Sequence, residues 1–150
     1  MPVRKLSEGS ICGRILLVDD NSNGLKARKT VLEEHGHRIT TARGGEEALE
    51  IFSRQKFELV ITDYQMPGMD GLELISRLRK QTPEALIILL SGFVDSLGFS
   101  QENTGADCVI QKSANEVHHL VRAVSRLLQP RNAKKPAFGE RALKARRKAV

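Results

Sequence analysis

Five polar side chains in this sequence lie just past the ends of apolar runs of strand length: Asp19, Asp20, Asp63, Ser91 and Lys112. Three carboxylates in one crevice repel one another unless a cation neutralises them. Carboxylate oxygens are the ligands that Mg²⁺ prefers, and this ion keeps positions open for a phosphoryl oxygen. A lysine adds a positive charge for an anion, and a serine adds a hydroxyl. The set predicts a site that accepts a phosphoryl group on a carboxylate while a metal ion and a lysine absorb its charge.

Segments typical of strands alternate with segments typical of helices between residues 14 and 128. Five apolar or β-branched runs predict strands, at 14–18, 37–42, 57–62, 85–90 and 106–110. Four stretches with apolar residues at helical spacing predict helices, at 22–34, 44–54, 72–80 and 115–128. The first helix places Leu25, Arg28, Val31 and Leu32 at this spacing. The stretch 93–104 is the weakest helix prediction because Gly98 interrupts it.

This alternation favours βαβ units with right-handed crossovers. The predicted fold class is therefore α/β, a doubly wound five-stranded parallel sheet flanked by five helices. In such sheets ligands bind beyond the carboxyl ends of the strands. We expect the five polar side chains to meet at that edge.

The sequence lacks the residue sets that other catalytic chemistries need. The four histidines lie in or beside predicted helices, so none completes a Ser-His-Asp or Cys-His set: His35, His37, His118 and His119. Cys12 and Cys108 are too few for a disulfide framework and lack metal-ligand spacing. No apolar run is long enough to cross a bilayer, and no apolar segment typical of a secretory signal follows Arg4 and Lys5. We therefore expect a cytoplasmic location.

The net charge of +6 is unevenly distributed along the 150 residues. Residues 131–150 contain eight Lys or Arg and one acid, a net charge of +7, whereas the first 130 residues carry a net charge of −1. We predict an N-terminal extension at 1–12, one domain at 13–129 and a basic tail at 130–150. The tail composition favours disorder. A contact with nucleic acid or an anionic surface and a linker to a further domain are the alternatives.

Four stretches resemble, in order, the signature stretches of the receiver domains of two-component response regulators. They are Ile15-Leu-Leu-Val-Asp-Asp20, Asp63-Tyr-Gln-Met-Pro-Gly-Met-Asp-Gly71, Leu90-Ser-Gly92 and Gln111-Lys112. The resemblance covers roughly residues 13–128 and implies a flavodoxin-like receiver fold. It implies a signalling protein of a His-to-Asp phosphorelay that is not a turnover enzyme. A sensor histidine kinase or a phosphotransfer protein would supply the phosphoryl group, and phosphorylation would switch the binding of a downstream protein.

The resemblance also implies roles for individual residues. Asp63 would be the phosphoacceptor. Asp19 and Asp20, together with Asp63 and the backbone carbonyl of Gln65, would hold Mg²⁺. Ser91 would donate a hydrogen bond to the bound phosphoryl group, and Lys112 would pair with it.

Two positions depart from the family pattern. Ser113 stands where the family usually has a proline preceded by a cis peptide bond, so a trans bond is expected here. Val109 stands where the family usually carries a tyrosine or phenylalanine that takes part in switching. The resemblance therefore predicts intact phosphorylation chemistry with a different route for the signal.

Two alternative functions remain open from the sequence. The first is a phosphatase of the haloacid-dehalogenase type, which also uses an aspartate nucleophile and Mg²⁺. Such enzymes need an Asp-x-Asp pair, whereas Asp63 is followed by Tyr64 and Gln65. The second is a scaffold that keeps the fold and is never phosphorylated.

Overall fold

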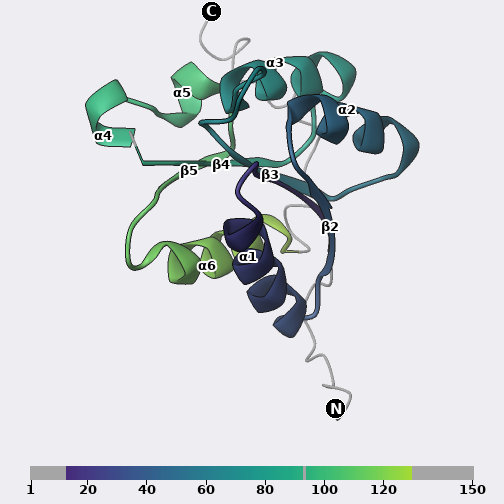
Figure 1. The fold of residues 1–150 in the computed structure, drawn as a ribbon, viewed down its shortest axis with the longest axis vertical. Coiled ribbons are helices and arrows are strands. Elements are labelled where there is room, and N and C mark those ends of the chain that lie inside the picture. Colours follow the sequence, from purple (N-terminus) through teal and green to yellow (C-terminus); the bar gives the residue numbers. More distant parts are fainter. Residues whose placement is uncertain (1–12, 93, 130–150) are drawn as a thin grey trace, which may run out of the picture.

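Five parallel strands form the centre of the fold, in the spatial order β2-β1-β3-β4-β5 (Figure 1). This computed structural model describes residues 13–92 and 94–129, so the predicted extension at 1–12 and the predicted tail at 130–150 lie outside the described residues. The strands are β1 (Arg14–Val18), β2 (Arg38–Ala42), β3 (Leu59–Asp63), β4 (Ile87–Ser91) and β5 (Cys108–Gln111). The order confirms the predicted doubly wound α/β fold.

Helices cover both faces of this sheet. Helices α1 (Ser22–Glu34) and α6 (Glu116–Leu127) lie on one face, below the sheet in Figure 1. The other face carries α2 (Gly45–Arg54), α3 (Gly71–Gln81), α4 (Val94–Leu97) and α5 (Gln101–Thr104). None of the helices described is long and apolar enough to cross a membrane.

The core has two layers because successive residues of a strand point to opposite faces. In β1, Ile15 and Leu17 pack with residues of α1 and α6, whereas Leu16 and Val18 pack with residues of α3. All four side chains are at most 1% exposed. Burial on both faces explains why this strand is a continuous apolar run rather than an alternating one.

The stretch 93–104 differs most from the prediction. It forms two helices of four residues each, α4 and α5, rather than one longer helix. Gly98 lies between them with a φ of 67°, a left-handed conformation that glycine adopts readily. Ser100 and Asn103 then form a reciprocal capping box that starts α5.

The ends of β3 and β4 lie one residue beyond the predicted apolar runs. Asp63 is paired with Leu90, and Ser91 is paired with Gln111, so both polar residues belong to the hydrogen-bonded ladder. The neighbouring strands fix the backbones of both residues, which places them at the edge of the sheet.

Candidate functional site

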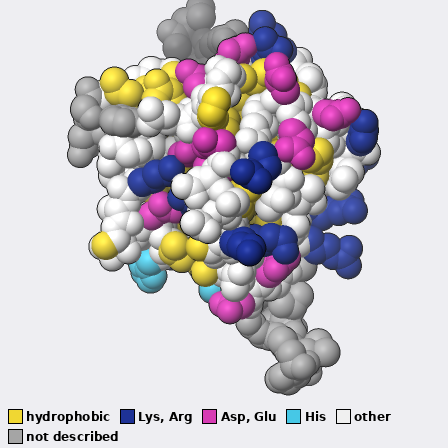
Figure 2. All heavy atoms as spheres, viewed as in Figure 1, with side chains coloured by type: hydrophobic (Ala, Val, Ile, Leu, Met, Phe, Trp, Pro, Cys, Tyr) yellow, Lys and Arg dark blue, Asp and Glu magenta, His cyan; other side chains and the backbone are white. Residues whose placement is uncertain are grey.

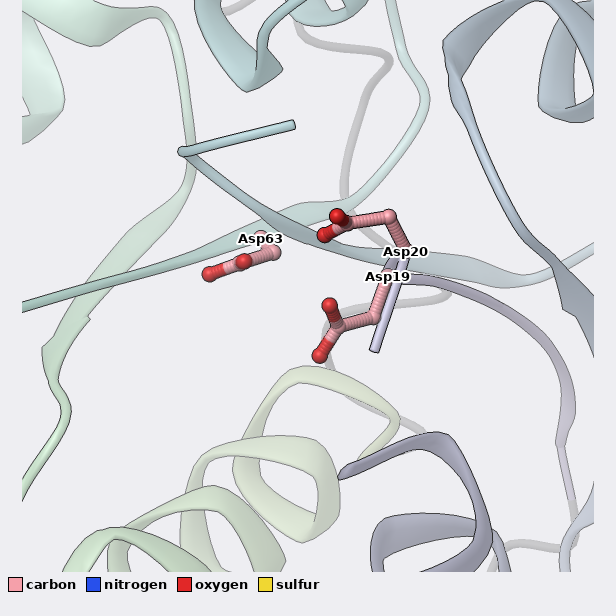
Figure 3. A group of neighbouring side chains, drawn as sticks. All are labelled: Asp19, Asp20 and Asp63. Atoms are coloured by element: carbon pink, nitrogen blue, oxygen red, sulfur yellow. The ribbon is translucent and has the colours of Figure 1, made fainter. Parts of the chain in front are cut away.

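Three carboxylates meet at the carboxyl ends of the adjacent strands β1 and β3. Asp19 directly follows β1, Asp20 comes next, and Asp63 is the last residue of the adjacent strand β3 (Figure 3). Each can place one oxygen so that the three atoms lie within 4.8 Å of one another. Asp19 and Asp63 are 2% and 4% exposed. Three carboxylates this close, two of them buried, form a donor set suited to a divalent cation.

Lys112 and Ser91 reach the same place from the neighbouring strands. The Nζ atom of Lys112 lies 2.5 Å from Oδ1 of Asp63. The backbone N–H of Lys112 donates to the carbonyl of Ser91 at 2.8 Å, which ties the residue after β5 to the end of β4. Ser91 itself is 1% exposed.

An open pocket of about 720 Å³ exposes this group to solvent. Its lining includes every residue that the sequence proposed for the site: Asp19, Asp20, Asp63, Gln65, Ser91 and Lys112. The structure thus brings together residues that are up to 93 positions apart in the chain.

Burial raises the pKa of Asp63 above its ordinary value. The ion pair with Lys112 opposes this effect, and the negative charge of Asp19 adds to it. An ionised Asp63 is therefore less favourable in the metal-free fold than in water. A bound cation would relieve this cost.

The loop after Asp63 is shaped by Gly71 at the start of α3. A Cβ atom on Gly71 would lie 2.5 Å from the carbonyl oxygen of Asp63 and 2.9 Å from Cα of Tyr64. Only glycine lets the helix begin this close to the chain that leaves β3. Asp70 caps the helix by accepting a hydrogen bond from the N–H of Glu73 at 2.9 Å.

Comparison with known proteins decides the family. The family model described as "Response regulator receiver domain" matches residues 15–125. The chain belongs to this family.

Curated relatives of similar sequence include transcriptional regulators. The chain is 36% identical to the probable transcriptional regulator ycf27 of Cyanidium caldarium over 80% of its own length and 49% of that protein. It is 30% identical to AfsQ1 of Streptomyces coelicolor, over 83% of the chain and 56% of that protein. The chain thus spans about half the length of these relatives.

A solved response regulator with a similar fold contains Mg²⁺ and BeF. The response regulator TrrA of Thermotoga maritima, in complex with Mg²⁺ and BeF, is 40% identical, with a TM-score of 0.70 over 77% of this chain and 98% of TrrA. TrrA has also been solved in complex with the histidine kinase ThkA, and that structure gives a TM-score of 0.69 over the same shares of the two chains.

The receiver domain departs from its family at Val109 and Ser113 as the sequence indicated. No peptide bond of the described residues is cis, so the bond between Lys112 and Ser113 is trans. Val109 is half-buried and packs at the edge of the core layer on the α3 side of the sheet.

An aromatic contact that the sequence did not predict lies close to the phosphoacceptor candidate. The rings of Tyr64, the residue after Asp63, and Phe99, between α4 and α5, pack edge to face with centroids 4.9 Å apart. The contact joins the end of β3 to the stretch that carries the two short helices. The two residues lie 35 positions apart, and this spacing does not predict a contact between their rings.

Arg28, which contacts Asp19, is a further residue to which the sequence assigned no role. Its Nη1 atom lies 2.6 Å from Oδ2 of Asp19, and its Nε atom lies 2.6 Å from Oε2 of Glu116. In the sequence, Arg28 is a charged residue within the apolar face of a predicted helix, between Leu25 and Leu32, and this position indicates a buried partner. Its partner in α6 could not be identified from spacing.

Proposed function

We propose that this receiver domain is a Mg²⁺-dependent phosphoacceptor that takes a phosphoryl group on Asp63. The observation that carries this proposal is the position of Asp63. It is buried at the end of the central strand, with Lys112 on one oxygen and two further carboxylates beside it. A sensor histidine kinase or a phosphotransfer protein is the proposed donor, by analogy with the complex of TrrA and ThkA.

In the proposed reaction, a carboxylate oxygen of Asp63 attacks the phosphorus atom of a phosphohistidine. The new bond joins this oxygen to phosphorus, the phosphorus–nitrogen bond breaks, and its electron pair stays on the imidazole of the donor. Lys112 already contacts Asp63 and would pair with the transferred group. The hydroxyl of Ser91 would donate a hydrogen bond to a phosphoryl oxygen. The domain accepts one group and is proposed not to be a turnover enzyme.

The three carboxylates fit Mg²⁺, which binds oxygen ligands and retains water molecules. Asp19, Asp20, Asp63 and the backbone carbonyl of Gln65 are the proposed ligands. When bound, the ion would neutralise the carboxylates and the incoming phosphoryl oxygens.

A phosphatase of the haloacid-dehalogenase type is not favoured. Its Asp-x-Asp pair would require an acid at residue 65, where this chain has glutamine. Uptake of a phosphoryl group from acetyl phosphate tests the proposal against both alternatives. We expect one stable adduct per chain with Mg²⁺ and none in EDTA, whereas a phosphatase would turn over and a silent scaffold would remain unmodified.

The output proposed for the phosphorylated domain is altered binding of a downstream protein in the cytoplasm. Curated relatives such as AfsQ1 are transcriptional regulators about twice as long as the matched part, so a link to gene regulation is one form that this output could take.

We expect phosphorylation to change the stretch 91–104 more than the final helix. The contact between Tyr64 and Phe99 connects this stretch to Asp63, and its two short helices make it the least regular part of the described chain. Hydrogen exchange with and without beryllofluoride measures this. Faster or slower exchange within 91–104 is expected, with little change at 115–128. Changes centred on Val109 and 115–128, with 91–104 unaffected, would contradict this route.

The predicted tail at 130–150 is proposed to be dispensable for phosphorylation. Leu128, which follows α6, is buried. On the face that Figure 2 shows, basic side chains of the described surface lie among acidic ones. Deletion of 131–150 should leave the rate of phosphorylation unchanged and remove any salt-dependent affinity for nucleic acid or acidic lipid. Loss of phosphorylation in the truncated chain would show that the tail supports the domain.

A further inference from the structure

Arg28 is a buried charge that the proposed phosphorylation chemistry does not use. It lies in α1 with 8% of its surface exposed, on the same helix face as Leu25 and Leu32, which are 5% and 1% exposed. Removing a guanidinium group from water is unfavourable unless carboxylates compensate it closely. Packing alone therefore does not explain why a buried arginine occupies this position.

The partners of Arg28 connect the acidic site to the last helix. Nη1 donates to Oδ2 of Asp19 at 2.6 Å. On its other side, Nε and Nη2 donate to the two oxygens of Glu116, at 2.6 and 3.2 Å. Glu116 is the first residue of α6 and is 8% exposed. One guanidinium group is thus shared between a proposed metal ligand and a residue outside the metal site. In Figure 3, the carboxylate of Asp19 extends toward the face that carries α1 and α6.

Gly24 makes room for this arrangement. A Cβ atom on Gly24 would lie 3.0 Å from Nη1 of Arg28 and 3.0 Å from Oδ2 of Asp19. Any side chain there would press on both atoms of the ion pair. The absence of a side chain one turn before Arg28 lets the guanidinium group reach Asp19.

The carboxylates of the acidic group and the side chains ion-paired with them leave an excess of negative charge that one divalent cation would balance. Four carboxylates and two cations give a net charge of −2: Asp19, Asp20, Asp63 and Glu116 with Arg28 and Lys112. Neutralising Glu116 would halve this excess. It would also leave Asp19 as the only carboxylate opposite Arg28.

We propose that Arg28 is a positioning residue that holds Asp19 and competes with the metal for it, and that Glu116 sets the metal affinity by sharing the guanidinium group. This inference rests on the proposed function, because it assumes that Asp19 is a ligand of Mg²⁺. It adds a determinant of affinity in α6, 97 positions from Asp19 in the sequence.

Glu116→Gln in the full chain tests the inference, since glutamine keeps the shape and one acceptor oxygen. Isothermal titration with MgCl₂ should give a Kd about tenfold higher than that of the wild type, a loss typical of residues that support metal ligands. Glu50→Gln, which neutralises an exposed acid of α2 paired with Arg54, is the charge-matched control and should leave Kd unchanged.

A further variant separates this role from a structural one. Adding Arg28→Met to Glu116→Gln removes the competitor and restores the net charge, so the double variant should bind Mg²⁺ more tightly than Glu116→Gln alone. Tm without Mg²⁺, measured for each variant, reports on the fold separately.

An unchanged Kd in Glu116→Gln would overturn the inference and leave the proposed function standing. A double variant that binds more weakly than Glu116→Gln would also overturn it, because Glu116 would then act without Arg28. Failure of the wild-type chain to bind Mg²⁺ would remove the proposed function together with the inference.

Discussion

Asp63→Asn is expected to reduce phosphorylation by acetyl phosphate to background and to raise the Tm of the metal-free protein. The first effect follows because the amide offers no carboxylate oxygen to attack phosphorus. The second follows because burial raises the pKa of Asp63, so the folded state loses stability as the pH rises through that pKa. Asparagine does not ionise, so the variant avoids this loss at neutral pH. Mass spectrometry of the treated protein and a thermal melt in EDTA measure the two effects.

Asp70→Asn is the matched control for this variant. Asp70 belongs to the same loop, and its side chain caps α3, a role that asparagine fills equally well. We expect full phosphorylation of the control. A stoichiometric adduct on the Asp63→Asn protein would show that another residue is the acceptor.

Asp20→Ala is expected to abolish the stabilisation of the protein by Mg²⁺. At a concentration about 100 times Kd, a ligand stabilises the native state by about 2.7 kcal/mol, which raises Tm by roughly 10 °C for a domain of this size. Asp20 is more exposed than the other two carboxylates, so its removal should leave the fold intact while the ion loses a ligand. Thermal melts with and without MgCl₂ measure the shift.

Glu50→Ala serves as the control for this second variant, because it removes an exposed carboxylate on α2, away from the pocket lining. Its melting temperature should rise with Mg²⁺ as in the wild type. A normal rise in the Asp20→Ala protein would mean that Asp20 is not a ligand and that the acidic group has another purpose.

The strongest sequence patterns predicted the fold best. The apolar run of β1 and the capped helix α1 were predicted with the bounds that the structure shows, Arg14–Val18 and Ser22–Glu34. The strand is a continuous apolar run, the helix has apolar residues at helical spacing, and polar residues follow the one and precede the other. The stretch 93–104 was predicted poorly because its form depends on Gly98 and on packing of Phe99 against Tyr64, a tertiary contact.

The candidate site was also predicted only in part from the sequence. Asp19, Asp63 and Lys112 could be selected because parallel strands bring their carboxyl ends to one edge. The ion pair of Arg28 with Glu116 could not, because this contact between α1 and α6 joins residues 88 positions apart. The apolar spacing of a helix shows which face is buried, but it does not show which residue of a distant helix will meet that face.

The most direct test of the central claim is to locate the phosphoryl group on the full chain. The protein is treated with acetyl phosphate and Mg²⁺, and peptide mapping by mass spectrometry then identifies the modified residue. The phosphoaspartate account predicts one phosphoryl group per chain, on Asp63, which disappears when EDTA replaces Mg²⁺. A phosphoryl group on another residue, or the same yield in EDTA, would contradict it.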